Sequence, residues 1–87
     1  MASGYSIEIE TSAAKALTRI ERPFRIKIIN AIADLGMDPR PHGCTKLSGR
    51  TDAYRIRIAD YRVIYTINDG IRVVRVQKIA HRREVYR

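Results

Sequence analysis

The sequence predicts an α+β domain in which two helices cover one face of a mainly antiparallel β-sheet. Two patterns support this prediction. Apolar residues recur at helical spacing between residues 12 and 35, and they alternate with polar residues between residues 54 and 79. The expected order is a strand, an antiparallel helix pair, a three-strand antiparallel meander and a short C-terminal tail. With 87 residues there is material for one hydrophobic core, so we expect a single domain over residues 1–87.

The first strand is expected over Tyr5 to Glu10, where apolar and polar side chains alternate. Ser12 is suited to cap the first helix, and Pro23 suits the first turn of the second, where its missing amide proton would have no partner. Gly36 is a natural end for the second helix. The apolar stripes of the two helices are Ala13, Leu17 and Ile20, and then Phe24, Ile28, Ala31, Ile32 and Leu35.

Residues 38–43, Asp-Pro-Arg-Pro-His-Gly, cannot continue a helix and are expected to form an ordered loop. The three meander strands are expected over Tyr54 to Ile58, Tyr61 to Ile67 and Ile71 to Ile79. Ala59-Asp60 and Asp69-Gly70 are short enough to be two-residue hairpin turns. Because two helices cover only one face of such a sheet, the other face should stay open.

Two-residue turns fix which residues face each other. The first hairpin then sets Arg57 opposite Arg62, and the second sets Val74 opposite Tyr65 and Val76 opposite Val63. The helix-covered face receives the apolar residues Tyr54, Ile56, Ile58, Tyr61, Val63, Tyr65 and Ile67. The open face receives Arg55, Arg57, Arg62, Arg75 and Gln77.

The net charge of +8 lies mostly in the second half of the chain. Residues 1–45 have six Lys or Arg against five Asp or Glu, whereas residues 46–87 have eleven against four. Like charges directly opposite each other destabilise a sheet, so stability does not explain Arg57 facing Arg62. Guanidinium groups bind phosphate in a bidentate fork, and the cluster therefore favours a phosphate-binding face. The alternative is a solvated basic surface that only aids solubility.

Several classes of protein are excluded by the composition. No apolar run approaches the roughly 20 residues that cross a bilayer, and no signal peptide is recognisable, so we expect a cytoplasmic protein. Cys44 is the only cysteine and is given no role. His42, His81 and Cys44 lack metal-ligand spacing, so neither a metal nor a cofactor is expected.

The tail, residues 81–87, brings a histidine, arginines and a tyrosine next to the basic face. These are residue types that RNA cleavage needs. The alternative is a polar terminus that frays, although Val85 and Tyr86 would anchor it.

Four segments together resemble the RelE/ParE superfamily of bacterial toxin–antitoxin toxins, and specifically its RelE-type ribonucleases. They are Lys46-Leu47-Ser48-Gly49, Tyr54-Arg55-Ile56-Arg57-Ile58, Asp60-Tyr61-Arg62-Val63-Ile64-Tyr65 and His81-Arg82-Arg83-Glu84-Val85-Tyr86. The resemblance covers nearly the whole chain. It implies an mRNA interferase that enters the A site of the 70S ribosome and cuts messenger RNA without metal. It also implies a cognate antitoxin that covers or distorts the basic face.

The resemblance also implies a catalytic set. The family uses basic residues on the first meander strand, an arginine on the next, and an arginine and a tyrosine near the end. The matching residues are Arg55 and Arg57, Arg62, and Arg82 and Tyr86. The best-described members have lysines at the first two positions, where this chain has arginines.

Arginine stays protonated at neutral pH, so proton transfer is assigned to His81 as general acid or base. Arg62 and Arg82 are expected to clamp the phosphate, with Arg55 and Arg57 binding the backbone and stabilising charge. Tyr86 is expected to stack on a base or to share in proton transfer. Further RNA contacts are expected from Lys46, Arg75 and Arg83. The products would be a 2′,3′-cyclic phosphate and a 5′-hydroxyl.

Two rival functions remain open. One is a ParE-like toxin that keeps the fold but inhibits DNA gyrase by protein contact. The other is an RNA- or DNA-binding module without catalysis. The arginine, histidine and tyrosine set favours the ribonuclease, because a gyrase inhibitor would not need it.

Overall fold

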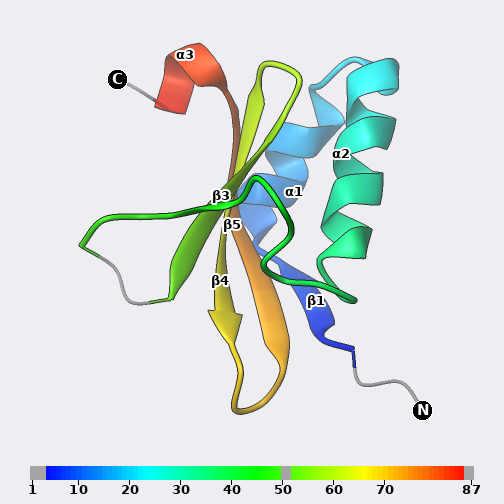
Figure 1. Cartoon of the computed structure of the whole chain (residues 1–87). Coiled ribbons are helices and arrows are strands. Elements are labelled where there is room, and N and C mark those ends of the chain that lie inside the picture. The colour runs from blue at the N-terminus through cyan, green and yellow to red at the C-terminus, as the bar shows by residue number, and fades with distance from the viewer. Residues whose placement is uncertain (1–3, 50–51, 86–87) are drawn as a thin grey trace.

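The computed structural model describes residues 4–49 and 52–85. Its elements, in order, are β1 (Ser6–Ile9), α1 (Thr11–Thr18), α2 (Arg22–Asp34), β2 (Thr45–Lys46), β3 (Ala53–Ile58), β4 (Tyr61–Asn68), β5 (Val73–His81) and α3 (Arg82–Val85). Figure 1 shows α1 and α2 on one side of the sheet, antiparallel to each other, and α3 on the other side at the end of β5. The predicted α+β class and the order of its elements are confirmed.

The strands form one five-stranded sheet in the order β1-β5-β4-β3-β2. The antiparallel meander β3-β4-β5 is as predicted, and β1 adds to it in parallel, with Ile7 opposite Val74 and Glu8 opposite Arg75. The sequence analysis missed β2, because two residues are too few to show a strand period. This short strand pairs antiparallel with β3, and its Thr45 lines the candidate site described below.

The start of α1 and the end of α2 are both determined by β1. The N-cap of α1 is Glu10, so the prediction of Ser12 is wrong. The backbone N–H of Glu10 still donates to Val76 O at 2.9 Å, and the helix begins directly after this last bond to β5. At the end of α2, Tyr5 N donates to Gly36 O at 2.7 Å, and a Cβ at Gly36 would lie 3.2 Å from Tyr5 O. Gly36 thus follows the helix as predicted, because the incoming strand leaves little room for a side chain.

The β3–β4 hairpin has the predicted register, with Arg57 opposite Arg62 and Ile58 opposite Tyr61. The turn consists of Ala59 and Asp60, and Ala59 has a positive φ of 53°. A positive φ at the first turn position is typical of the type II′ hairpin turn, which suits the twist of the flanking strands.

The predicted register of the β4–β5 hairpin is wrong. Asn68 pairs with Val73, so the loop has four residues, and Val74 faces Ile67 while Val76 faces Tyr65. The cause is the Asn68 side chain, whose Oδ1 accepts hydrogen bonds from the backbone N–H of residues 70 and 71 and closes a wider turn. A β-bulge follows between Ile64 and Tyr65.

Beyond the bulge, Lys78 faces Ile64 and Ala80 faces Arg62. The open-face position expected for Gln77 is therefore taken by Lys78. Arg75 is on the open face as predicted, opposite Thr66.

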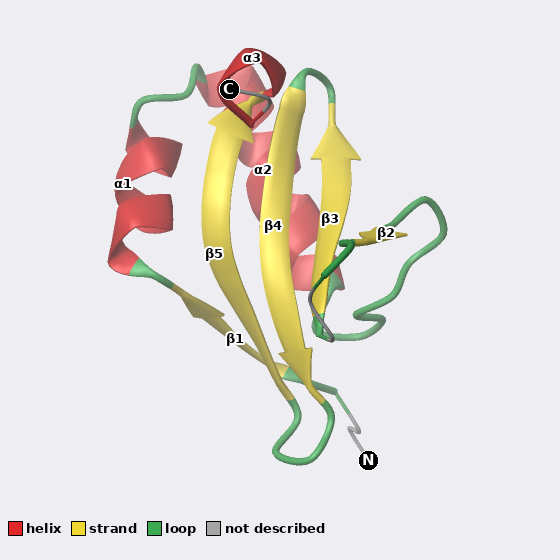
Figure 2. Ribbon diagram, turned by 90° about the vertical axis from the view of Figure 1, so that its left-hand side faces the viewer, coloured by secondary structure: helices red, strands yellow, loops and turns green. Residues whose placement is uncertain are grey.

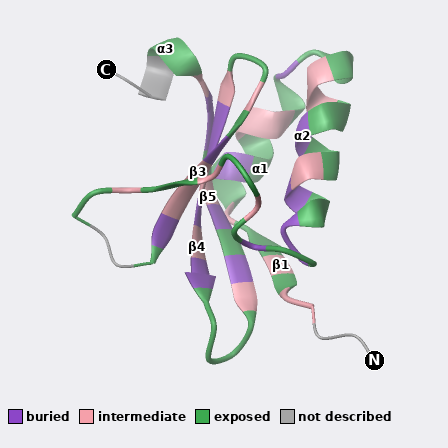
Figure 3. Cartoon of the chain, viewed as in Figure 1, coloured by how far each residue is buried: buried purple, intermediate pink, exposed green. Residues whose placement is uncertain are grey.

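The core lies between the sheet and the two helices, as the burial colours of Figure 3 indicate. Its largest fully buried side chains are Tyr65, Ile28, Leu35, Val63, Val74 and Val76. They come from α2, the residue that follows it, β4 and β5, and alternate positions of the two strands contribute. Figure 2 turns the opposite face toward the viewer, and there α1 and α2 lie behind and beside the strands. The side chains on this open face are consequently available to a ligand.

Candidate functional site

A pocket of about 420 Å³ opens on the open face, beside β3. β3 and β4 provide one side of it, and the loop after α2 together with β2 provides the other. We call it the arginine pocket, and its lining residues are His42, Gly43, Thr45, Arg55, Ile56, Arg57 and Arg62. The structure thus brings together three of the six predicted catalytic residues.

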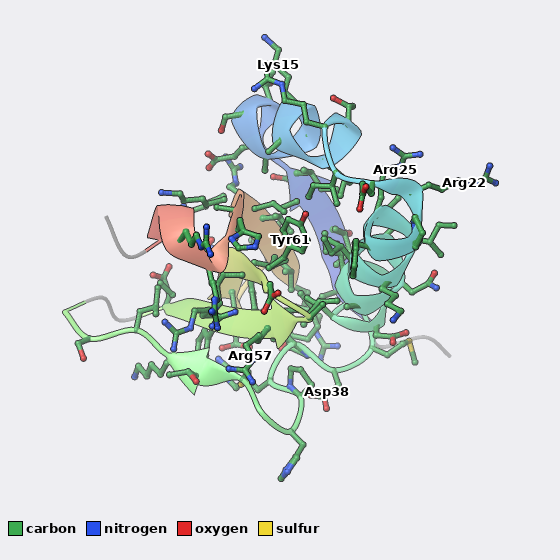
Figure 4. All side chains as sticks on the ribbon, turned by 90° about the horizontal axis from the view of Figure 1, so that it is seen from above. Lys15, Arg22, Arg25, Asp38, Arg57 and Tyr61 are labelled. Carbon is green, nitrogen blue, oxygen red and sulfur yellow. The ribbon has the colours of Figure 1, made fainter. Side chains whose placement is uncertain are left out.

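The three arginines come from neighbouring strands in the predicted register. Arg55 and Arg57 alternate with Ile56 on β3, and Arg62 of β4 is directly opposite Arg57. Figure 4 looks down on this end of the sheet, with Arg57 labelled away from the helices and Tyr61 nearer to them. Among the described residues that line the pocket, none is acidic. Three guanidinium groups that line one hollow suit an anion with several oxygens, such as a phosphodiester.

Arg62 and Arg57 differ in their access to water. Arg62 keeps only 6% of its surface exposed, whereas Arg57 is exposed. Moving a guanidinium out of water costs several kcal/mol before its interactions compensate. A recessed cation also acts in a lower effective dielectric, where it attracts an anion more strongly than a surface cation does. The arginine pocket therefore has a recessed cation, Arg62, at its floor and a solvent-exposed one, Arg57, at its rim.

The loop that forms the wall is held to the core by Tyr65. This tyrosine is fully buried, and its hydroxyl donates to Pro39 O at 2.8 Å. Burial raises the pKa of the Tyr65 phenol, which keeps it protonated as a donor. Cys44 packs against the same core cluster. The wall of the pocket is thus fixed by a contact on the helix side of the sheet.

A second contact holds the loop from outside. Arg40 Nη2 lies 2.9 Å from Asp69 Oδ2, its Nε donates to Tyr54 OH at 3.1 Å, and the Tyr5 hydroxyl donates to Asp69 Oδ1 at 2.6 Å. The Arg40 guanidinium, with help from Tyr5, holds the pKa of Asp69 below its usual range. The same bond to Asp69 raises the pKa of the Tyr5 phenol. These side chains link β1, the β4–β5 loop and the wall of the pocket.

His42 is the functional candidate that the sequence analysis missed. It is exposed and occupies the first central position of a tight turn, in which Cys44 N donates to Pro41 O at 3.0 Å. Gly43, with φ of 93°, occupies the second, which is the type II turn pattern. The available signal was the Pro-His-Gly sequence itself, which predicts such a turn. Its place beside the arginines depends on β2, which the sequence did not indicate.

The predicted RNA-binding residues lie outside the pocket. Arg75 is on the open face near the β1 edge, and its Nη2 is 2.8 Å from Glu8 Oε1. Lys46 is exposed and pairs with Tyr54, so it alternates with Thr45 and is not among the lining residues. Arg83 is exposed on α3.

His81 is not brought to the arginine pocket. It pairs with Tyr61, its ring meets the Tyr61 ring edge-on at 5.5 Å, and its Nδ1 accepts a hydrogen bond from Arg83 N at 3.3 Å. It lines a smaller hollow of about 160 Å³ with Ala16 of α1 and with Arg19 and Ile20, which follow that helix. His81 therefore belongs to the helix-covered side of the sheet, whereas Arg62 and its partner Ala80 belong to the open side.

The tail contributes less to the described site than predicted. Arg82 is exposed at the start of α3, where its backbone N–H donates to Asp60 O at 2.7 Å. Tyr86 lies outside the described residues. Within residues 4–49 and 52–85, no helix is long and apolar enough to cross a membrane. The same residues include no cluster of three or more His, Cys, Asp or Glu that could hold a metal ion.

The sequence matches a family model described as the ParE toxin of the type II toxin–antitoxin system, parDE, over residues 7–86. The chain is a member of the ParE toxin family. It is thus a toxin of a type II toxin–antitoxin system, and the resemblance to the RelE/ParE superfamily is confirmed. No curated protein matches this toxin in sequence.

Solved structures of RelE toxins share the fold of this toxin. RelE in the archaeal RelE–RelB complex from Pyrococcus horikoshii OT3 is 30% identical, with a TM-score of 0.81 over 90% of this chain and 94% of that one. The isolated E. coli RelE toxin is 27% identical, with a TM-score of 0.79 over 94% and 90%. The toxin of the Mycobacterium tuberculosis RelBE2 toxin–antitoxin complex is 20% identical, with a TM-score of 0.79 over 90% and 98%, which shows a common fold. By structure, the toxin resembles the RelE-type branch of the superfamily.

Proposed function

We propose that this toxin is an endoribonuclease that cleaves messenger RNA in the ribosomal A site and so stops translation. The observation that carries the proposal is the arginine pocket, where Arg55, Arg57 and Arg62 from two neighbouring strands line one hollow. The likeness to RelE toxins at 25–30% identity supports the same activity. In the cell the toxin would meet its messenger and the 70S ribosome in the cytoplasm.

The chemistry needs charge stabilisation and proton transfer. The 2′-oxygen of the ribose forms a bond to phosphorus as the bond from phosphorus to the 5′-oxygen breaks, leaving a 2′,3′-cyclic phosphate and a 5′-hydroxyl. Arg62 at the floor and Arg57 at the rim would hold the non-bridging oxygens, whose negative charge grows in the transition state. Arg55 would bind the adjacent backbone. In the cleavage proposed, these guanidinium groups stabilise the charge without a metal ion.

The remaining predicted catalytic residues stay proposals. Arg82 would join the phosphate clamp from α3, and Tyr86 would stack on a base or share in proton transfer. The assignment of proton transfer to His81 stays a prediction too, and the position of its ring on the helix-covered side does not support it.

A cognate antitoxin is the proposed protein partner. RelE is found with RelB in the P. horikoshii complex, and a comparable pair exists in M. tuberculosis. An antitoxin segment with acidic side chains would complement the arginine pocket and prevent RNA from entering it.

Inhibition of DNA gyrase is the second candidate, because the matching family model is that of ParE toxins. This function would need a protein-binding surface and no scissile phosphate. Inhibition of gyrase does not explain why three arginines line one pocket.

One pair of assays separates the candidates. The purified toxin is added to 70S ribosomes translating a defined messenger, the stalled complexes are located by toeprinting, and the RNA ends are analysed. Gyrase supercoiling is measured beside them. Cleavage with 2′,3′-cyclic phosphate ends that is lost in the Arg57→Gln, Arg62→Gln double variant supports the ribonuclease. Intact messenger together with inhibited supercoiling would refute it, and tight RNA binding without cleavage would indicate a plain binding module.

A further inference from the structure

Cleavage at the arginine pocket requires a group that can accept a proton. Arginine cannot do so near neutral pH, because its guanidinium stays protonated. The other described residues that line the pocket are His42, Gly43, Thr45 and Ile56. An aliphatic chain and a neutral hydroxyl are not bases at this pH, whereas the imidazole of histidine gains and loses protons between about pH 5 and 8.

We infer that His42 is the general base of this toxin, taking the proton from the attacking 2′-hydroxyl. The inference rests on the proposed function, since it names a catalytic residue for the same pocket. As the bond from the 2′-oxygen to phosphorus forms and the bond to the 5′-oxygen breaks, the imidazole nitrogen takes the 2′-proton. The leaving 5′-oxygen takes a proton from water, and the imidazolium returns its own proton to solvent.

The loop is built to hold His42 still. The turn is closed by the bond from Cys44 N to Pro41 O, and Gly43 supplies the positive φ that the type II turn needs. Two residues before the turn, Pro39 O is tied to the buried Tyr65 hydroxyl, and Arg40 is tied to Asp69. Prolines on both sides of Arg40 restrict the backbone further. A base must lie within hydrogen-bond reach of its proton, and a fixed loop meets this need better than a mobile one.

The charged residues that line the pocket together with His42 are Arg55, Arg57 and Arg62. A guanidinium does not accept a proton near neutral pH, whereas an imidazole can, so His42 is the candidate base among the described lining residues. The cleavage rate should therefore fall at acidic pH, where the imidazole becomes protonated and stops accepting protons.

The test compares wild type with His42→Gln and His42→Ala on translating ribosomes between pH 5.5 and 8.5. Because His42 is exposed, both variants should fold, as thermal unfolding would verify. We expect cleavage to fall by about 10²- to 10⁴-fold in both variants and its acidic decline to disappear. Added imidazole should restore part of the activity of His42→Ala and should leave His42→Gln unaffected, because only the smaller side chain leaves space. A purely structural role would predict no such rescue.

Three outcomes would overturn the inference, and they differ in whether they also refute the proposed function. Wild-type cleavage and an unchanged pH profile in His42→Gln would refute the role of His42 and leave the proposed function standing. Loss of the acidic decline in His81→Gln instead would transfer the role to that histidine. Absence of any cleavage by the wild-type toxin would refute the proposed function and the inference together.

Discussion

The open face of the sheet has two halves that use the same residue type with opposite electrostatic results. At the β1 edge, Arg75 is 2.8 Å from Glu8, and the pair is about half exposed. At the β3 edge, Arg57 faces Arg62, and none of the described residues that line their pocket is acidic. The difference teaches that the position of the carboxylates decides where an anion can bind. The number of arginines on a face does not decide it.

The largest effect is expected from Arg62→Gln, which removes the recessed cation. Loss of one fixed group that stabilises transition-state charge typically lowers the rate about 10²- to 10³-fold. Arg62→Lys should recover only part of this, because lysine keeps the charge but not the bidentate fork. Single-turnover cleavage on ribosomes measures the effect, with Lys27→Gln on the outer side of α2 as a charge-matched control. Equal cleavage rates for Arg62→Gln and Lys27→Gln would show that the pocket arginine contributes no more to cleavage than a surface cation does.

Tyr65→Phe tests whether the wall of the pocket depends on the core. The variant leaves the buried Pro39 carbonyl without its donor, which should lower the free energy of unfolding by about 1–3 kcal/mol. Tyr54→Phe is the matched control, because its hydroxyl accepts a more exposed bond from Arg40 and should cost less. Urea unfolding of both variants provides the measurement. Equal losses would mean that the Tyr65 hydroxyl does not hold the loop.

Arg57→Gln and Arg75→Gln compare the two halves directly. The substrate analogue is an RNA oligonucleotide with 2′-O-methyl riboses, which binds without being cleaved. Removing one phosphate contact to a single strand should reduce the slope of log affinity against log salt by about 0.7. We expect this reduction for Arg57→Gln and less than half of it for Arg75→Gln, whose charge is already compensated by Glu8. A larger change in this slope for Arg75→Gln than for Arg57→Gln would show that RNA binds mainly at the β1 edge of the open face and not at the β3 edge.

Glu8→Gln should make the weaker half more like the stronger one. Without its carboxylate partner, Arg75 is available to phosphate, and RNA affinity at low salt should rise by at most about five-fold, since an exposed ion pair is worth up to about 1 kcal/mol. High salt should erase the gain by screening. Unchanged affinity at every salt concentration would show that RNA does not reach this edge.

The smallest effect is expected from Asp69→Asn and depends on pH. The pKa of Asp69 is lowered in the folded chain, so ionisation stabilises the fold. This contribution is fully present above the ordinary carboxyl pKa and disappears as pH falls through the lowered folded value. Urea midpoints of wild type and Asp69→Asn should therefore differ at pH 7 and converge toward pH 3. A gap that widens in acid would contradict the assigned sign.

Local patterns in the sequence determined much of this fold. The alternation over residues 54–67 and a two-residue turn were enough to place Arg57 opposite Arg62, because a strand has a period of two and any error in register would expose the core. The β4–β5 register was not predictable in the same way. It depends on the side-chain bonds of Asn68 and on a bulge, and neither changes the apolar pattern before it.

The placement of the arginines was predicted because it depends on that hairpin, whereas the placement of His42 was missed because it depends on distant contacts. His42 reaches the arginines through β2, through Tyr65 and through the ion pair with Asp69, whose partners are up to 29 residues apart in the chain. His81 was assigned by its neighbours in sequence, and strand alternation instead turns it toward Tyr61. Adjacent residues of one strand point to opposite faces, so His81 lies opposite Tyr61 on the helix-covered face although its neighbour Ala80 is opposite Arg62 on the open face.

The bulge in the last hairpin has a further effect on the pocket. Without the bulge, the regular pairing that sets Tyr65 opposite Val76 would continue along both strands. Arg62 would then lie opposite Ile79, and Lys78 would lie opposite Val63 in the core. The extra residue restores Ile79 to the interior and leaves the small Ala80 next to Arg62. Inserting one further residue beside Gln77, with the bulge kept at its present size, would alter no arginine and no histidine, yet it would shift the end of β5 by one position and set the branched side chain of Ile79 opposite the recessed guanidinium of Arg62. In this toxin, the length of one strand is as much a determinant of the binding surface as the identity of its charged residues.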